Sequence, residues 1–319
     1  MDTVKEQIRE KGLALGFAEV RFASAEPFDA WRETVDGLQG EYRPRGVFRM
    51  THEPRKLMQD AASIAVCLLP FALNAPLPED VAPFAAYYPA SQYAHNLAME
   101  LAAFIDSLGY KARANPMLPA RHAALRAYGG MYGSNRLFVH PKYGSLVAIR
   151  LILTNACGPD EPPADKKHKC PECGKCISAC PVGVLTHERF EAEKCLRTYT
   201  GRGNVPEEVR DKVMTLIGCE YCTRACPYNA MQKEAMPPEE VLDAFKYENI
   251  LSGASMERLV DLVGSNFIDE GKIEAMTALT AANRGRKEAI PLLQKLTEDG
   301  REKVGKQAAW ALEKLEGKG

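Results

Sequence analysis

The sequence predicts a chain of three parts: a mixed α/β domain, built as an α+β sandwich, in residues 1–155, a cysteine-rich module in residues 156–236 and an all-helical region in residues 237–319. Three observations carry this division. Helix-like and strand-like apolar patterns alternate up to about residue 155. Eight of the ten cysteines lie between residues 170 and 227. Beyond Pro237-Pro238 the apolar spacing is helical throughout.

Helices and strands alternate in the first part. Residues 2–16 are apolar at near-helical spacing and end at Gly16, a residue typical of helix C-termini. Residues 61–71 are apolar almost throughout, which predicts a strand covered on both faces. An apolar stripe predicts a helix over 91–108, with Ser91 as its N-cap. The other predicted elements are strands at 19–23 and 110–114, a helix at 120–127, short helices within 27–58, and a strand pair formed by 136–139 and 146–154.

Two cysteine runs dominate the second part, which follows a polar linker over 155–169. The first run, C-x2-C-x2-C-x3-C-P, consists of Cys170, Cys173, Cys176 and Cys180, and the second, C-x2-C-x3-C-P, of Cys219, Cys222 and Cys226. Closely spaced cysteines wrap one [4Fe–4S] cube, while the cysteine before the proline serves the other cube. The pattern therefore predicts a ferredoxin-like module with two [4Fe–4S] clusters.

The ligands can be assigned once Cys195 is included. It is the only cysteine between residues 170 and 227 that belongs to neither run. Eight thiolates then serve two cubes, four to each. The first cluster takes Cys170, Cys173, Cys176 and Cys226, and the second takes Cys180, Cys195, Cys219 and Cys222.

Other roles for these cysteines are disfavoured. Zinc sites use paired C-x2-C knuckles, which do not end in C-x3-C-P. Disulfides require an oxidising compartment, and no signal peptide is visible at the start of the sequence. Cys67 lies in an apolar strand and is expected to be a buried structural thiol, whereas Cys157 stays unassigned.

Helical spacing in the third part predicts helices near 259–263, 273–279, 290–296 and 304–315. Two alanine-rich sequence segments, separated by about the length of one pair of helices, suggest HEAT-like repeats. So few repeats bury little core alone, so they are expected to pack on the rest of the chain.

The amino-acid composition limits which binding partners and which cellular compartment are expected. A formal net charge of −1 gives no overall field that would attract DNA. No apolar run approaches the roughly 20 residues that span a bilayer, so we expect a cytoplasmic protein without membrane contact. Residues 284–318 hold nine Lys or Arg and six Asp or Glu, which allows at most a weak tRNA contact.

The order of the parts resembles the epoxyqueuosine reductases and the related reductive dehalogenases over nearly the whole chain. The cysteine pattern, including the isolated Cys195, is the most specific feature. Residues 132–135 resemble a G-K-N turn of the family, and residues 140–145 its H-P-x-x-G-S turn. The resemblance implies a flavodoxin- or ferredoxin-type electron donor and a base-off cobalamin without a histidine from the protein. The residues it implies for cofactor binding are Arg121, Tyr132, Gly133, Asn135, Gly144 and Ser145.

The sequence also departs from the family. Where the family has a catalytic Asp ahead of a Glu-Arg pair, residues 114–121 retain Arg121 but hold Asn115 and no carboxylate. An amide cannot donate a proton as a carboxylic acid does. Since the reductive dehalogenases imply a tyrosine donor, Tyr128 and Tyr132 are the expected catalytic residues. Ser134 and Leu146 replace the family's Lys and Trp beside the two turns.

These features together predict an enzyme that relays electrons through two [4Fe–4S] clusters to a corrinoid, which reduces an unidentified substrate. One alternative is a cobalamin-free electron-transfer protein, against which the size of the first domain weighs. The other is a tRNA epoxyqueuosine reductase proper, against which the missing acid weighs.

Overall fold

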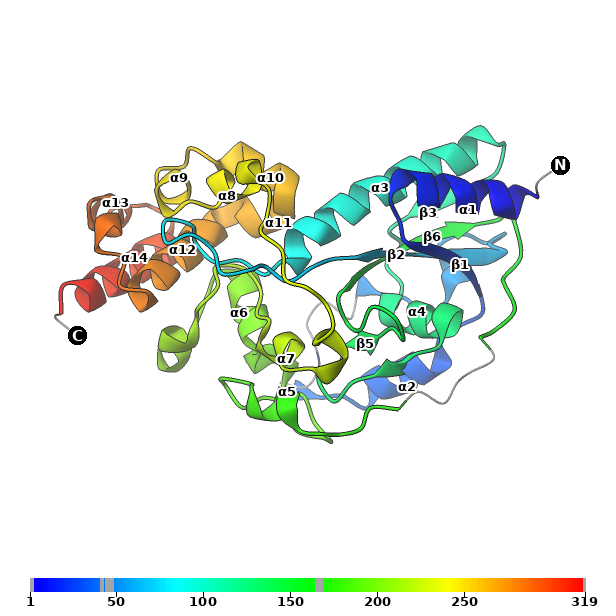
Figure 1. The fold of residues 1–319 in the computed structure, drawn as a ribbon, viewed down its shortest axis with the longest axis horizontal. Coiled ribbons are helices and arrows are strands. Elements are labelled where there is room, and N and C mark those ends of the chain that lie inside the picture. The colour runs from blue at the N-terminus through cyan, green and yellow to red at the C-terminus, as the bar shows by residue number, and fades with distance from the viewer. Residues whose placement is uncertain (1–2, 41–42, 44–48, 164–168, 318–319) are drawn as a thin grey trace.

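The structure, a computed structural model, describes residues 3–40, 43, 49–163 and 169–317. Its N-terminal half is a sheet between two helical layers (Figure 1). The strands, all paired antiparallel, follow the order β1 (Glu19–Ser24), β2 (Ser63–Pro70), β6 (Val147–Thr154), β3 (Ala112–Ala114). An antiparallel sheet with helices on both faces is the α+β sandwich expected from the sequence, not a parallel doubly wound fold.

The alternation of side chains along β2 explains why that strand is apolar throughout. Ile64 and Val66 face α4 (Ala120–Tyr128), near α2 (Asp29–Asp36). Cys67 faces the opposite layer, formed by α1 (Val4–Leu15) and α3 (Tyr87–Ser107). The thiol of Cys67 is fully buried there, in agreement with its expected structural role.

Helix α3 begins earlier than predicted. Ser91 was expected to cap the helix, but α3 already starts at Tyr87 and includes Pro89 in its first turn. Proline is tolerated there because the first N–H groups of a helix have no intrahelical acceptor. Ser91 instead accepts hydrogen bonds from the guanidinium of Arg150 through its backbone oxygen and its hydroxyl.

The predicted pairing of 136–139 with 146–154 is wrong. The short strand β5 (Phe138–Val139) pairs with β4 (Met131–Tyr132), whereas β6 lies between β2 and β3. Because β6 is apolar over most of its length, burial at the centre of the large sheet outweighs a local hairpin. Only a single bridge joins His140 to Gly144.

The C-terminal region is helical, as predicted. Its four expected helices are present, with three further short helices between and before them. An arrangement as HEAT repeats is not confirmed. The helices are α8 (Glu239–Ala244), α9 (Tyr247–Leu251), α10 (Met256–Val263), α11 (Ser265–Ile268), α12 (Lys272–Asn283), α13 (Ile290–Leu296) and α14 (Glu302–Leu315). Within the described chain, no helix has the length and apolar character needed to cross a bilayer.

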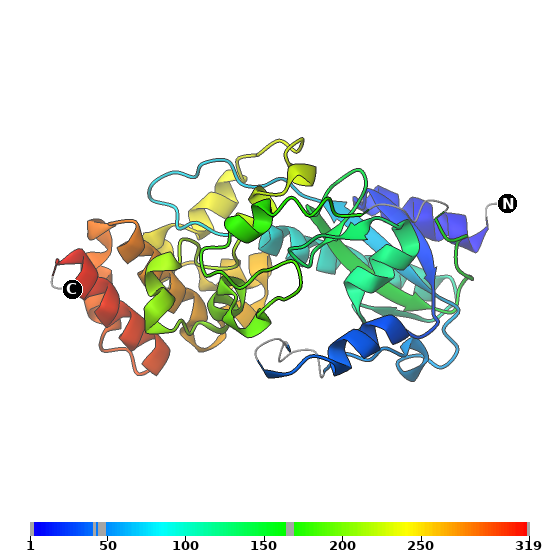
Figure 2. The ribbon, with the colours of Figure 1, turned by 90° about the horizontal axis from the view of Figure 1, so that it is seen from below.

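The two ends of the molecule share a core. Residues 81–88, which precede and begin α3, pack among the C-terminal helices and not on the sheet. Phe84 stacks on Phe245 with ring centroids 3.8 Å apart. From this core α3 runs back to the sheet, so one helix spans both halves (Figures 1 and 2).

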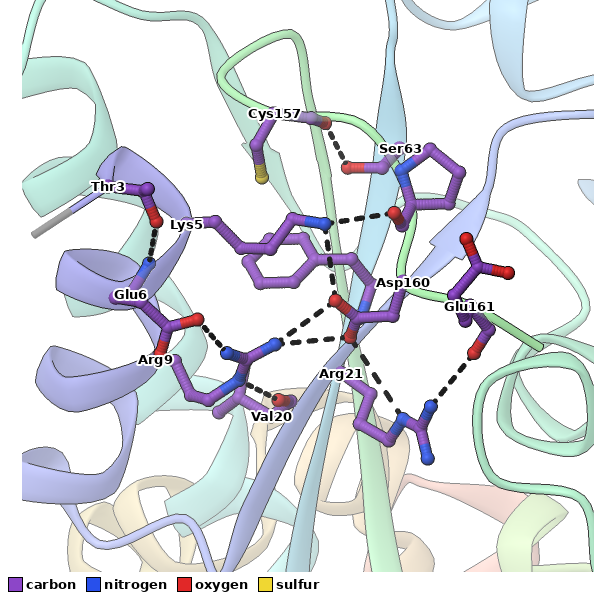
Figure 3. A network of polar contacts seen from close by, with 12 residues as sticks. Thr3, Lys5, Glu6, Arg9, Val20, Arg21, Ser63, Cys157, Asp160 and Glu161 are labelled. Atoms are coloured by element: carbon purple, nitrogen blue, oxygen red, sulfur yellow. Dashed lines mark hydrogen bonds and ion pairs between the residues drawn. The ribbon is translucent and has the colours of Figure 1, made fainter. Parts of the chain in front are cut away.

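The start of the linker is held against the first strand by Asp160 (Figure 3). Its carboxylate accepts hydrogen bonds from Phe22 N at 2.9 Å and from Arg9 Nη2 at 3.1 Å, and pairs with Lys5 Nζ at 3.2 Å. Burial opposes the charge, but these partners outweigh burial and lower the pKa of Asp160. The linker therefore leaves the sheet from a fixed point.

We expect Asp160→Asn to reduce the free energy of unfolding at neutral pH by about 1–3 kcal/mol, the range for hydrogen bonds to a charged group. The folded-state pKa lies below that of an unfolded Asp. The contribution is therefore present above the unfolded pKa and is lost as the pH falls through the folded pKa. Urea unfolding at several pH values measures it.

Glu161→Gln is the matched control, because only the backbone oxygen of Glu161 joins this network. Equal destabilisation by both substitutions would contradict the role given to the Asp160 carboxylate.

Candidate functional site

Each cysteine run contains one short helix. Cys176 lies in α5 (Lys175–Ser178) and Cys222 in α7 (Tyr221–Arg224). Before α5 the backbone turns through left-handed conformations at Glu172, with φ 52°, and at Gly174, with φ 71°. These turns curl the first run so that its thiols converge on one side.

The thiols of Cys170, Cys173, Cys176 and Cys226 form one group. Burial raises the pKa of Cys176, and the neighbouring Cys170 and Cys226 raise it further. Cys226 in turn is affected by Cys170 and Cys173. The structure thus brings the first three cysteines of one run beside the last cysteine of the other, the combination expected from the spacing.

The thiols of Cys180, Cys195, Cys219 and Cys222 form the second group. Burial raises the pKa of Cys219 and of Cys222 to about 12, and Cys195 and Cys180 contribute to both shifts. Cys222 also interacts with Cys176 of the first group, so the two groups are neighbours. Such thiols must lose their protons when a metal binds, since only thiolates are ligands.

The geometry differs from that of a single-ion site. None of the described cysteines forms a disulfide. Across the described residues, no set of three or more His, Cys, Asp or Glu is arranged to hold one metal ion. A cubane lies between its four ligands and keeps their sulfurs further apart than ligands of one ion. The chemistry of the donor set, four thiols in each group, fits a [4Fe–4S] cluster.

The two turns expected to bind a cofactor both contact the cysteine runs. Ser134 Oγ lies 3.5 Å from Cys170 Sγ, and Asn135 Nδ2 donates to Cys222 O at 3.4 Å. Ser145 N donates to Asn229 Oδ1 at 2.9 Å, just beyond the second run. These turns therefore join the sheet domain to the cysteine module.

The close approach at Gly144 is made by the protein itself. The family resemblance implied cofactor binding at Gly133 and Gly144. A Cβ at Gly144 would lie 2.6 Å from Tyr228 O and would collide with Asn229 Oδ1. At Gly144, which also has φ 63°, glycine is required by packing against the second run.

Tyr128 is a core residue, and its surroundings argue against the catalytic role predicted for it. Its side chain is 7% exposed, and its hydroxyl donates to Val66 O in the central strand at 2.6 Å. Its proton is thus engaged inside the sheet domain. Burial raises the pKa of Tyr128 well above the ordinary value.

Tyr132 has a different environment, in which a proton can be exchanged. Its hydroxyl lies 2.7 Å from Nδ1 of His122, and its side chain lines a cavity of about 920 Å³ that Cys170 also lines. Burial, helped by Arg121 and Arg126, lowers the pKa of His122 to about 4. Burial raises the pKa of Tyr132, so a protonated phenol stands beside a neutral imidazole at neutral pH.

Two arginines lie near thiols of the second group, Arg121 near Cys222 and Arg197 near Cys195. Burial lowers the pKa of Arg121, on which the charges of Arg197, Tyr87, Tyr132 and Cys222 also act. Both arginines are nevertheless exposed to solvent. Arg197 lines a cavity of about 690 Å³ between α3 and α10–α11.

Four residues near the site were not predicted from the sequence: Tyr87, His122, Arg150 and Arg197. Two of them have a sequence feature that could have pointed to a role in the site. Arg150 is the one charged residue in the apolar strand β6, and Arg197 follows Cys195 by two positions at the start of α6 (Leu196–Arg202). His122 and Tyr87 have no such sequence feature, since their roles depend on neighbours that only the fold brings close.

Comparisons with known proteins agree with this site. Residues 169–229 match the family model described as a 4Fe-4S double cluster binding domain. Over 342 residues the chain is 27% identical to an epoxyqueuosine reductase of Bacillus subtilis, covering 98% of this chain and 88% of the relative. Over 210 residues it is 30% identical to one of Lactococcus garvieae, and here the match covers 61% of this chain and only 58% of the relative.

Solved structures show the same fold. An epoxyqueuosine reductase of Streptococcus thermophilus aligns with a TM-score of 0.79 at 19% identity, covering 98% of this chain and 90% of that one. An epoxyqueuosine reductase with an epoxyqueuosine-modified tRNA-Tyr stem loop aligns with a TM-score of 0.76 at 24% identity and the same coverage. A reductive dehalogenase reaches only 0.48, too low to support an argument.

Fold and site together define an iron–sulfur protein with a double [4Fe–4S] domain attached to an α+β sandwich. In sequence and in fold, the chain is similar to the epoxyqueuosine reductases along nearly its entire length.

Cys195→Ser tests the ligand that the spacing left isolated. Anaerobically reconstituted protein should hold about eight irons per chain, and the variant about four, because only the second cluster loses a thiolate. Iron and sulfide analysis, with electron paramagnetic resonance of the reduced protein, measures the change.

Cys157→Ser is the control, since this thiol stands outside both groups and should leave the iron content unchanged. Two intact clusters in Cys195→Ser would exclude Cys195 as a ligand.

Proposed function

We propose that this chain is a tRNA epoxyqueuosine reductase that receives electrons through two [4Fe–4S] clusters. The full-length likeness to epoxyqueuosine reductases, 27% over 98% of the chain, is the observation that carries the proposal. It favours this function over an unidentified substrate, our first expectation from the sequence. The tRNA complex of a protein with the same fold supports RNA as the partner.

The clusters supply single electrons, and this chain's residues determine where they emerge. Cys222 of the second group lies beside Arg121, and Arg121 also interacts with Tyr132. The reacting group of the substrate is placed beside these side chains, next to the second cluster. The arginines there favour a substrate that gains negative charge during reduction.

Tyr132 is the proton donor in this proposal. Removal of an epoxide oxygen as water consumes two electrons and two protons, so a donor is needed. Asn115 cannot serve, because an amide is not an acid. Its side-chain oxygen and nitrogen are buried and have no hydrogen-bond partner in the described part of the chain. Tyr132 keeps its proton at neutral pH, and His122 can hand on a replacement through Nδ1.

A cavity beside Arg197 also suits a corrinoid, the cofactor that the family resemblance implies. The phenol of Tyr87 and the guanidinium groups of Arg150 and Arg197 line this cavity of about 690 Å³ between α3 and α10–α11. Such donors suit the amide and phosphate oxygens at the edge of a corrinoid. A bound corrinoid would supply a low-potential metal centre for a two-electron reduction. Tyr87, Arg150 and Arg197 would then hold its periphery.

The direct test is an anaerobic assay on the reconstituted chain with reductant, cobalamin and tRNA that contains epoxyqueuosine. We expect queuosine to appear in the tRNA, measured by mass spectrometry of the digested nucleosides. Loss of product when either cobalamin or the clusters are left out is expected as well. Clusters that are reduced and reoxidised without queuosine formation would argue for another substrate.

Tyr132→Phe should lower the reduction rate by about 10²–10⁴-fold, the range for loss of a positioned general acid. Tyr128→Phe is the matched control, because it removes a hydroxyl that is buried in the sheet domain and bonds Val66 O there. That variant should lose about 1 kcal/mol of stability and keep its rate. Equal rates for Tyr132→Phe and the unaltered chain would assign the proton to another group.

Cobalamin binding has its own spectroscopic signature. We expect the protein to retain cob(II)alamin in a base-off form, with no nitrogen splitting on the cobalt lines in electron paramagnetic resonance. Nitrogen splitting would show a coordinated base or histidine. No retained cobalamin after gel filtration would favour the cobalamin-free electron carrier.

A further inference from the structure

One cysteine of the first group stands at the surface of the molecule. Of the eight cysteines in the two groups, only Cys173 is exposed to solvent, whereas Cys176 is buried and the others are partly covered. In the second group, Cys222 lies instead beside Arg121, one of the side chains assigned to the substrate. A partner that arrives from solution therefore meets the first group before the second.

Exposed apolar side chains follow directly on a ligand of this group. Cys226, whose thiol interacts with that of Cys173, is succeeded by the short 3-10 helix Pro227–Asn229. Tyr228 in this helix is 39% exposed, and Met231 just beyond it is 89% exposed. Methionine adapts its shape to different partners, and neighbouring exposed apolar side chains are typical of binding surfaces.

Three exposed lysines accompany these apolar side chains. Lys142 belongs to a turn that contacts the same segment, since Gln232 Nε2 donates to Lys142 O at 3.4 Å. Lys175 lies in α5, within the first cysteine run, and Lys233 follows Met231 by two positions. All three are exposed to solvent, and in the part of the chain that the structure describes none of them pairs with a carboxylate.

The acids nearby do not cancel this positive charge. Glu234 is already paired with Arg224, whose Nη1 lies 2.6 Å from the carboxylate. Glu172 is exposed, but it lines the cavity of Tyr132 together with Lys169, so a positive charge accompanies it there. The charge that remains on this surface is positive, and such a surface attracts acidic proteins and speeds their encounter with the chain.

We propose that this surface is the docking site of an acidic one-electron carrier protein, which reduces the first cluster. Complementary charge brings the carrier to the site, and the apolar side chains hold it for the time of one transfer. Electron-transfer complexes have small interfaces, so a surface of this size suffices. The site, which we call the entry face, consists of Cys173, Tyr228, Met231, Lys142, Lys175 and Lys233.

A protein fits the entry face better than RNA does. Surfaces that bind single-stranded RNA combine basic residues with aromatic platforms on which the bases stack. The most exposed apolar side chain here is a methionine, and the exposed cysteine beside it marks a site for electron transfer.

One electron moves in each encounter. The carrier is oxidised by one electron and the first cluster is reduced by one, with no atom transferred. Two encounters supply the two electrons that the proposed reduction consumes. The inference rests on the proposed function only for this direction of electron flow.

Stopped-flow absorbance of the anaerobic, cluster-loaded full chain tests the entry face with reduced flavodoxin, a small acidic protein, as the probe. We expect the second-order rate constant for cluster reduction to fall as salt is added. The double variant Lys142→Glu/Lys233→Glu should lower it about tenfold or more, and Met231→Ser about threefold or more. Lys295→Glu, which reverses an exposed charge on α13, is the matched control and should leave the rate unchanged.

Reduced methyl viologen, a small cation that needs no docking site, checks the clusters themselves. It should reduce every variant at least as fast as the unaltered chain, and iron content is recorded for each. Met231→Ser gives an independent result if the double variant loses a cluster. A flavodoxin rate that responds neither to salt nor to the lysine reversals would overturn the proposal, as would an equal loss in Lys295→Glu.

Two further measurements separate the carrier from other occupants. The reduction assay contains neither tRNA nor cobalamin, so its outcome is independent of whether epoxyqueuosine is the substrate. Added tRNA that slows the flavodoxin reaction of the unaltered chain, but not that of Lys142→Glu/Lys233→Glu, would assign the entry face to RNA and overturn the proposal. A dimer in sedimentation velocity that Met231→Ser dissociates would assign it to a second copy of the chain.

Discussion

One buried carboxylate joins the two halves of the molecule. Glu220 stands between two residues of the second cysteine run, and its oxygens bind the backbone of Ala86 and the guanidinium of Arg224. Burial raises the pKa of Glu220, yet the charge lies at the N-terminus of α3, where negative charge is favoured. The adjacent Gly218, with φ 80°, allows the run to approach closely, since a Cβ there would lie 2.5 Å from the ring of Tyr88. This contact holds the start of α3, and with it Tyr87, against the second cysteine run.

Docking of α3 on the cysteine module brings polar side chains from several elements together beside the second group of cysteines. Arg121 of α4 interacts with Cys222, with Tyr87 at the start of α3 and with Arg197 of α6. None of these elements alone makes a site. Their convergence leaves several arginines with few acids, and this imbalance favours anionic ligands and reduced intermediates over cationic ones.

The departures from the family pattern are local and have local compensation. Asn115 has φ 49° and an unpaired amide, so the position retains its unusual backbone but not an acid. Tyr132 and His122, which our proposal makes the proton source, form a hydrogen bond a short distance along the chain, from β4 and α4. Ser134, in place of a lysine, lies against Cys170 and helps to lower the pKa of that thiol, together with the backbone of Glu172 and against the effect of burial.

The sequence by itself determined what depends on short spacing. It specified the thiol groups through C-x2-C runs, the central strand through its apolar run, and four C-terminal helices through their period. Tertiary structure decided what depends on distant contacts. The partner of β5, the early start of α3, the core position of Tyr128 and the convergence of Arg121, Arg150 and Arg197 all arise from segments far apart in the chain. Periodicity reports which face of an element is buried but not what covers that face, so only the fold could assign these roles.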